Sequence, residues 1–129
     1  MLQQEVVKRM AASPGSKAWG KLSVMCQYYC QVDHLFDVPP EAFTPAPRVM
    51  SSIVRLVPHE RPPVSISDFD AFESLLSRSF SMRRKTLRNS LRGTLTPEQI
   101  VAAGVDPAAR PETLGLEAFA ALTEQFVRN

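Results

Sequence analysis

A proline-rich segment at residues 59–67, with the sequence HERPPVSIS, divides the chain into two parts with different patterns. The segment contains two adjacent prolines and few side chains that a core could bury, which is typical of a linker. Before it, short helical and extended patterns alternate, and after it the apolar residues keep a helical period. The sequence therefore predicts an α/β unit at residues 1–58, a linker at 59–67 and a small all-α domain at 68–129.

The first part looks like an incomplete α/β unit. Residues 5–12 have helical composition, and an apolar stripe predicts a second helix at 22–32. A short strand is predicted at 35–38. The alternation of residues 51–57 predicts a second strand, antiparallel to the first and near a sheet edge. Residues 1–3 have the composition of a strand end. Two or three strands cannot bury both faces of a sheet, so further strands are expected to belong to this unit. The stripe consists of Leu22, Met25, Cys26, Tyr29 and Cys30.

The second part has the signals of separate helices. Asp68 suits the N-cap of a helix that runs to about Leu91, with Ser81 as a point where it could break. Thr96 and the proline after it favour the start of another helix, which Gly104 would end. Residues 116–127 predict the last helix. Its expected inward side chains are Phe119, Leu122, Phe126 and Val127.

Composition excludes several classes of protein. The chain has no run of 18 apolar residues, so no membrane span is expected. Its start has no apolar core of a signal peptide, which favours a cytoplasmic protein. Cys26 and Cys30, four residues apart in an apparent helix, suit buried thiols in a reducing compartment. His34 and His59 offer no metal-ligand spacing, so no metal site is expected.

Positive charge is concentrated in one block, although the net charge of the chain is only +2. No acidic residue occurs between Glu73 and Glu98. On a continuous helix over residues 76–92, four of the basic side chains would lie opposite the apolar stripe. A solvated face usually mixes charges of both signs, so the pattern favours phosphate binding. The basic residues of the block are Arg78, Arg83, Arg84, Lys85, Arg88 and Arg92.

Five linked motifs cover the chain in order and resemble those of ribosomal RNA small-subunit adenine dimethyltransferases of the KsgA type. They lie at residues 1–9 (MLQQEVVKR), 15–24 (GSKAWGKLSV), 38–56 (VPP, FTPAPRV and SSIVRL), 83–91 (RRKTLRNSL) and 110–114 (RPETL). One departure is Met50, which occupies a position that is usually acidic in the family.

The resemblance implies the C-terminal half of a Rossmann-like methyltransferase domain followed by a helical domain. The family transfers methyl groups from S-adenosylmethionine to the exocyclic amines of two adjacent adenines in small-subunit ribosomal RNA. The chain has no glycine loop, no ribose-binding acid and no N-[LIP]-P-[YF] motif. We therefore expect no catalytic residue in this chain, no binding of S-adenosylmethionine and no activity by the chain alone.

The resemblance also suggests which residues meet RNA. Phe43, on a proline-stiffened loop with Pro45, resembles the family's aromatic residue at the target-base pocket, although a role as a core anchor of the loop is equally plausible. Arg48 could meet a phosphate, and Thr86, Asn89 and Ser90 could add neutral hydrogen bonds. Tyr28 and Tyr29 are expected in the core.

Two readings of function stay open at this point. The first is an enzyme segment that acts on the assembling small ribosomal subunit and is monomeric at full length. The second is a non-catalytic RNA-binding or ribosome-assembly module. A weaker third reading takes the helical domain as a DNA-binding helix-turn-helix.

Overall fold

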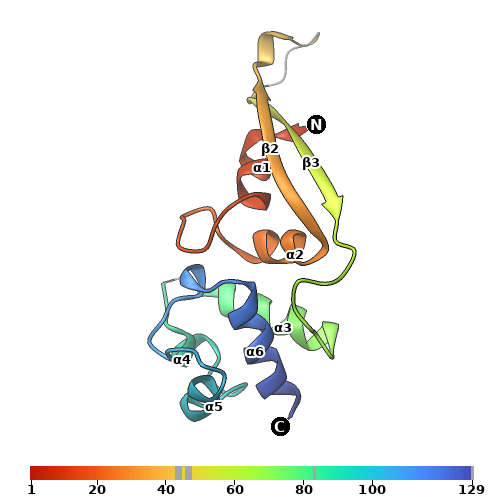
Figure 1. The fold of residues 1–129 in the computed structure, drawn as a ribbon. Coiled ribbons are helices and arrows are strands. Elements are labelled where there is room, and N and C mark those ends of the chain that lie inside the picture. Colours follow the sequence, from red (N-terminus) through yellow and green to blue (C-terminus); the bar gives the residue numbers. More distant parts are fainter. Residues whose placement is uncertain (43–44, 46–47, 83, 129) are drawn as a thin grey trace.

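A three-stranded antiparallel sheet forms the β part of the computed structural model, which describes residues 1–42, 45, 48–82 and 84–128. The strands are β1 (Leu2–Gln3), β2 (Cys30–Val38) and β3 (Ser51–Pro58), in the order β1-β3-β2. β2 and β3 form a long hairpin (Figure 1). The predicted antiparallel pairing is confirmed. The predicted edge position is wrong, because β3 pairs on both sides and is the central strand.

Two helices contact this sheet. α1 (Gln4–Met10) follows β1 directly, and α2 (Lys21–Tyr29) precedes β2. The Ser23 hydroxyl accepts a hydrogen bond from the Gly20 backbone N–H at 3.1 Å and donates one to the Arg9 carbonyl, which ties the start of α2 to the end of α1.

The predicted end of α2 at residue 32 is wrong, because Cys30 is already extended and pairs with Pro58 in the hairpin. The predicted apolar stripe continues across the change from helix to strand at Cys30, so helical periodicity alone could not locate the end of α2. The strand is consequently longer than the predicted 35–38. It contains an irregularity between His34 and Phe36.

After Pro58, the described residues form helices and turns but no strand. The helices are α3 (Phe69–Ser81), α4 (Leu87–Ser90), α5 (Pro97–Ala102) and α6 (Leu116–Val127), with the 3-10 turn η2 (Pro111–Thr113) before α6. A second 3-10 turn, η1 (Pro40–Ala42), lies between β2 and β3. The predicted caps are confirmed: Asp68 accepts from the Ala71 N–H at 3.1 Å and Thr96 from the Gln99 N–H at 3.2 Å. Gly104 has φ +81° after α5, and α6 has the predicted bounds.

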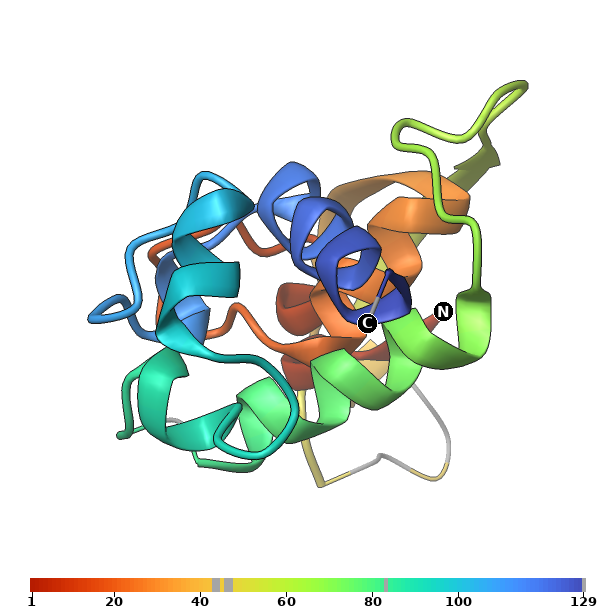
Figure 2. The same cartoon turned by 90° about the horizontal axis from the view of Figure 1, so that it is seen from below.

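One hydrophobic core joins both sides of the linker. Trp19 and Val24 are buried with side chains from the helices that follow the linker. α3 and α6 lie side by side in Figures 1 and 2 and supply half of those partners. The core residues that follow the linker are Phe72, Leu75, Leu76, Leu87, Leu91, Leu95, Ile100, Val105, Phe119 and Leu122.

Three residues expected to face inward are instead exposed. Tyr29 is 53% exposed, Leu22 42% and Val127 40%. Tyr28 is half-buried against the core, as expected. Over the part of the chain that the structure describes, no helix is long and apolar enough to cross a membrane.

Candidate nucleic-acid interface

The basic block does not lie on one continuous helix. α3 ends at Ser81 and α4 begins at Leu87, so Arg78 belongs to the last turn of α3 and Arg88 to α4. The prediction that four basic side chains share one face of a helix over residues 76–92 is therefore wrong, because it assumed a single continuous helix. The side chains are nevertheless exposed. The exposed basic residues of the block are Arg78, Arg84, Lys85, Arg88 and Arg92, and Arg83 lies outside the described residues.

The short helix α4 is held by two buried leucines and by a neighbouring loop. Leu87 and Leu91 are both fully buried. The backbone N–H groups of Leu87 and Arg88 donate to the carbonyls of Ala109 and Pro107, each at 2.9 Å. These bonds use the free donors at the start of α4 and fix the helix against residues 105–109. Arg88 itself is exposed.

Arg88 and Arg92 line two hollows. One, of about 280 Å³, is completed by Gly93, Leu95, Thr96 and Pro97. The other, of about 550 Å³, is completed by Thr86, Asn89, Asp106, Pro107 and Ala108. The Arg92 guanidinium donates to the Asn89 side-chain oxygen at 3.1 Å, which limits the freedom of that arginine. The structure thus brings Arg88 and Arg92 together at shared hollows.

The cations of this block have no acidic partner among the described residues. No described carboxylate lies within ion-pair distance of Arg78, Arg84, Lys85, Arg88 or Arg92. Other cations are paired: Lys21 lies 3.5 Å from Glu73, and the exposed Arg55 lies 3.0 Å from Asp33. The block therefore leaves its charge available to an anion, and guanidinium groups match phosphate oxygens well.

Residues expected at a target-base pocket are only partly described. Pro45 and Arg48 are exposed, whereas Phe43 lies outside the described residues. The expected role of Ser90 in hydrogen bonding to RNA is not supported, because its hydroxyl is buried and has no hydrogen-bond partner. Asp106 and Pro107, which sequence reasoning did not select, line the larger hollow. An Asp-Pro pair next to small residues signals a turn, but nothing local indicates that the turn packs on α4.

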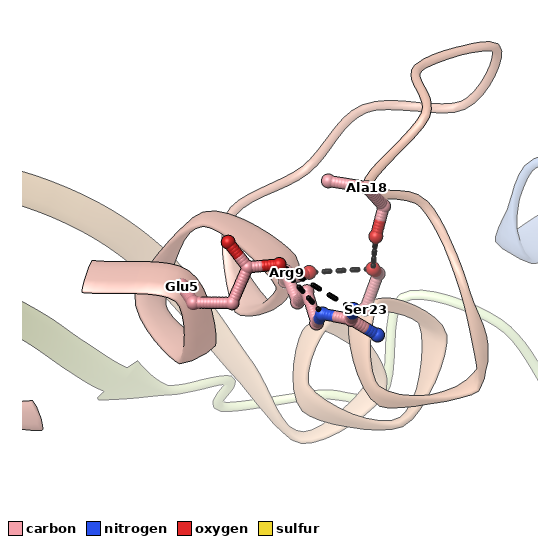
Figure 3. Close-up of polar contacts among 4 residues, drawn as sticks. All are labelled: Glu5, Arg9, Ala18 and Ser23. Carbon is pink, nitrogen blue, oxygen red and sulfur yellow. Dashed lines mark hydrogen bonds and ion pairs between the residues drawn. The ribbon is translucent and has the colours of Figure 1, made fainter. Parts of the chain in front are cut away.

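A third hollow, of about 610 Å³, lies between α1 and η2 and has mixed charge. It is lined by Glu5, Arg9, Lys17, Ala18 and Glu112. Figure 3 shows the Glu5–Arg9 ion pair, at 3.4 Å, beside the Ser23 hydroxyl.

The residues around that third hollow do not fit S-adenosylmethionine. None of its lining side chains is aromatic or a large aliphatic group that could hold an adenine. Gly15, which has φ +89°, donates its N–H to the Glu112 carbonyl at 2.6 Å instead of forming a phosphate or sugar cradle.

The described residues offer no metal centre, and Cys26 is not an activated thiol. No group of three or more His, Cys, Asp or Glu side chains among them could hold a metal ion. Burial raises the pKa of the Cys26 thiol, and the neighbouring Cys30 raises it further. A raised pKa lowers the thiolate fraction, which suits a packing role.

Comparisons with known proteins place these features in a family. A family model described as ribosomal RNA adenine dimethylase matches residues 1–126. Ribosomal RNA small subunit methyltransferase A from Pseudomonas putida is 54% identical over 126 residues, which are 98% of this chain and 47% of that protein. The protein of the same name from Alcanivorax borkumensis is 50% identical over 122 residues, which are 95% of this chain and 44% of that protein. The chain spans about half the length of these relatives.

Solved structures share the fold. A dimethyladenosine transferase from Plasmodium falciparum superposes with a TM-score of 0.82 at 24% identity, over 98% of this chain and 55% of that one. The 23S rRNA methyltransferase ErmE superposes with a TM-score of 0.68 at 23% identity, over 97% of this chain and 52% of that one. These likenesses show an α/β methyltransferase-like fold with a small antiparallel sheet and helices.

Proposed function

Because this chain belongs to the ribosomal RNA adenine dimethylase family, we propose that it is the C-terminal part of an enzyme that methylates two adjacent adenines in small-subunit ribosomal RNA. The enzyme would take its methyl groups from S-adenosylmethionine, act on the assembling small subunit in the cytoplasm and be monomeric at full length. Residues 1–58 would complete the methyltransferase domain. Residues 68–129 would form an RNA-binding helical domain.

The contribution of this chain is to hold the RNA backbone. The observation that carries this proposal is the exposed block of arginines and lysine that lacks acidic partners among the described residues. Such groups neutralise phosphates and release their condensed counterions, which drives binding without reading the base sequence. Arg48, together with Pro45 and Phe43, would meet the RNA near the target base.

Catalysis would require residues that this chain does not contain. Its sequence has no glycine loop and no N-[LIP]-P-[YF] motif, and the hollow near α1 does not suit the cofactor. We therefore propose that the chain alone neither binds S-adenosylmethionine nor transfers methyl groups. The second candidate, a non-catalytic RNA-binding or ribosome-assembly module, is favoured by the same basic block, because phosphate binding needs no cofactor.

The test combines binding with methyl transfer. Unmethylated small ribosomal subunits are incubated with the chain and labelled S-adenosylmethionine, then sedimented. We expect the chain to sediment with the subunits and the label to stay at the level of a no-protein control. Failure of the chain to sediment with the subunits contradicts RNA binding. Label above the control contradicts the proposal that the chain alone transfers no methyl groups.

Adding a separately expressed N-terminal half from a relative distinguishes the two candidates. Restored methylation that depends on this chain supports the enzyme. Binding to subunits with no restored methylation supports the assembly module.

A further inference from the structure

The larger hollow beside α4 combines cationic and neutral polar groups. Arg88 and Arg92 supply two guanidinium groups. Thr86, Asn89 and Asp106 supply a hydroxyl, an amide and a carboxylate. A site for phosphates alone would need only the arginines, whereas a carboxylate can accept a hydrogen bond from a hydroxyl group. The combination therefore suits a ligand that carries both negative charge and a hydroxyl group.

The neutral and acidic groups keep unused hydrogen-bonding capacity. Thr86 occupies the N-cap position of α4, yet its hydroxyl makes no capping bond. Asn89 accepts from Arg92 through its oxygen, and its NH₂ group has no partner among the described residues. One oxygen of Asp106 accepts from the Ala108 N–H at 2.9 Å, which leaves the second oxygen free to accept.

These groups match the sugar of RNA. The ribose 2′-hydroxyl is both a donor and an acceptor, and it distinguishes RNA from DNA. It could donate to Asp106 or Thr86 and accept from Asn89. The two arginines would hold the phosphates on either side of that sugar. The backbone donors at the start of α4 play no part, because loop carbonyls already occupy them.

We propose that this hollow receives one ribose of an RNA strand, with Arg88 and Arg92 on its flanking phosphates and Thr86, Asn89 and Asp106 around its 2′-hydroxyl. The chain would then prefer RNA to DNA of the same sequence. This inference rests on the proposed RNA-binding function and adds a source of sugar specificity to it.

The test measures the affinity of the 129-residue chain for single-stranded RNA, DNA and 2′-O-methyl RNA of one sequence by fluorescence anisotropy. We expect RNA to bind roughly five- to tenfold more tightly than DNA, the value of about one net hydrogen bond. The 2′-O-methyl strand should fall toward DNA, because it cannot donate from the 2′ position.

Two variants remove the sugar contacts and keep the shape of the site. Thr86→Val deletes the hydroxyl, and Asp106→Asn deletes the charge but keeps an oxygen for the Ala108 N–H. The double variant should bring the RNA-to-DNA affinity ratio close to one while DNA affinity is kept or rises. Arg88→Gln is the matched control, and it should weaken both strands equally without changing their ratio. Circular dichroism of Thr86→Val alone verifies that the fold is intact.

The outcomes separate this inference from the function on which it rests. A parent that binds RNA and DNA equally, or a ratio unchanged in the double variant, overturns ribose recognition. If Arg88→Gln still weakens both strands in that case, phosphate binding stands. If the parent chain binds none of the three nucleic acids, both ribose recognition and phosphate binding are overturned.

Discussion

The indole Nε1 of Trp19 donates a hydrogen bond of 2.7 Å to the backbone oxygen of Leu114, 95 residues further along the chain. Trp19 is 1% exposed and belongs to the same core as the residues of α3 and α6. The α/β part and the helical part are therefore joined by a buried aromatic side chain as well as by the linker.

Trp19→Phe should lower the free energy of unfolding by about 1–3 kcal/mol. The variant keeps an aromatic ring but leaves the Leu114 carbonyl without its partner. Urea denaturation followed by circular dichroism measures the change. Tryptophan fluorescence cannot be used, because Trp19 is the only tryptophan and the variant removes it. Val101→Ala, at a site that is 60% exposed, is the control and should stay within about 0.5 kcal/mol. If Trp19→Phe lowers the free energy of unfolding no more than Val101→Ala does, the Trp19–Leu114 hydrogen bond does not stabilise the contact between the two parts.

Leu87→Ala should destabilise the chain by about 2–5 kcal/mol, because Leu87 is fully buried beneath α4 and the change leaves a cavity. Its neighbour Arg88 is exposed, so Arg88→Gln should stay within about 0.5 kcal/mol. Thermal or urea unfolding of both variants checks the contrast. Equal stability losses at the two positions would show that α4 is not seated as described.

Asp37 links three elements at the end of the hairpin. Its carboxylate accepts hydrogen bonds from Ser52 Oγ at 2.6 Å on β3 and from Gln4 Nε2 at 3.0 Å on α1, and lies 2.7 Å from His34 Nε2. The hydrogen bond from Ser52, then that of His34, lowers the pKa of Asp37 below its usual value.

This lowered pKa predicts a stability contribution that depends on pH. Folding favours the ionised form, so the contribution is complete above the unfolded-state pKa of about 4. It is lost as pH falls through the lower folded-state pKa. The difference in unfolding free energy between the parent and Asp37→Asn should therefore shrink as pH falls from 6 to 2. A difference that stays constant over this range would rule out a role for the ionised carboxylate.

Hydrogen exchange should show that the hairpin opens more easily than the helical core. Large side chains on the hairpin are exposed, whereas α3 buries four residues along one side. We expect faster amide exchange in β2 and β3 than in α3, with α2 closer to α3 because Val24 shares the core. Protection in the hairpin that equals or exceeds that of α3 would contradict this order. The exposed hairpin side chains are Leu35, Phe36, Leu56 and Val57.

Local chemistry predicted much of the helical part and less of the sheet. The cap at Thr96 and the periodicity of α6 were sufficient, because both are encoded within a few residues. The change from α2 to β2 at Cys30 was not predictable, since it depends on pairing with Pro58, 28 residues away. The central position of β3 likewise depends on β1, whose two residues carry almost no sequence signal.

The candidate site shows the same division. The absence of acids between Glu73 and Glu98 revealed the basic block without any structure. The break after Ser81 removes the single helical face that was expected, and only tertiary packing places Asp106 beside Arg88. The proposal of phosphate binding does not depend on a single continuous helix. It requires only exposed cations without acidic partners.

The central claim is that the basic block binds RNA phosphates, and the salt dependence of binding tests it most directly. Log affinity for a small-subunit ribosomal RNA fragment is measured against log salt for the parent, Arg88→Gln and Lys85→Gln. Arg55→Gln is the matched control, because Arg55 is exposed but lies 3.0 Å from Asp33. RNAs of different sequence should respond equally, since phosphates carry no base identity.

Each variant in the block should flatten the salt slope by roughly 0.7–0.9, the value for one lost phosphate contact, and should weaken binding. Arg55→Gln should leave both quantities unchanged. If the slope and the affinity of Arg88→Gln and Lys85→Gln equal those of the parent, the block is a solvated surface and the claim is wrong.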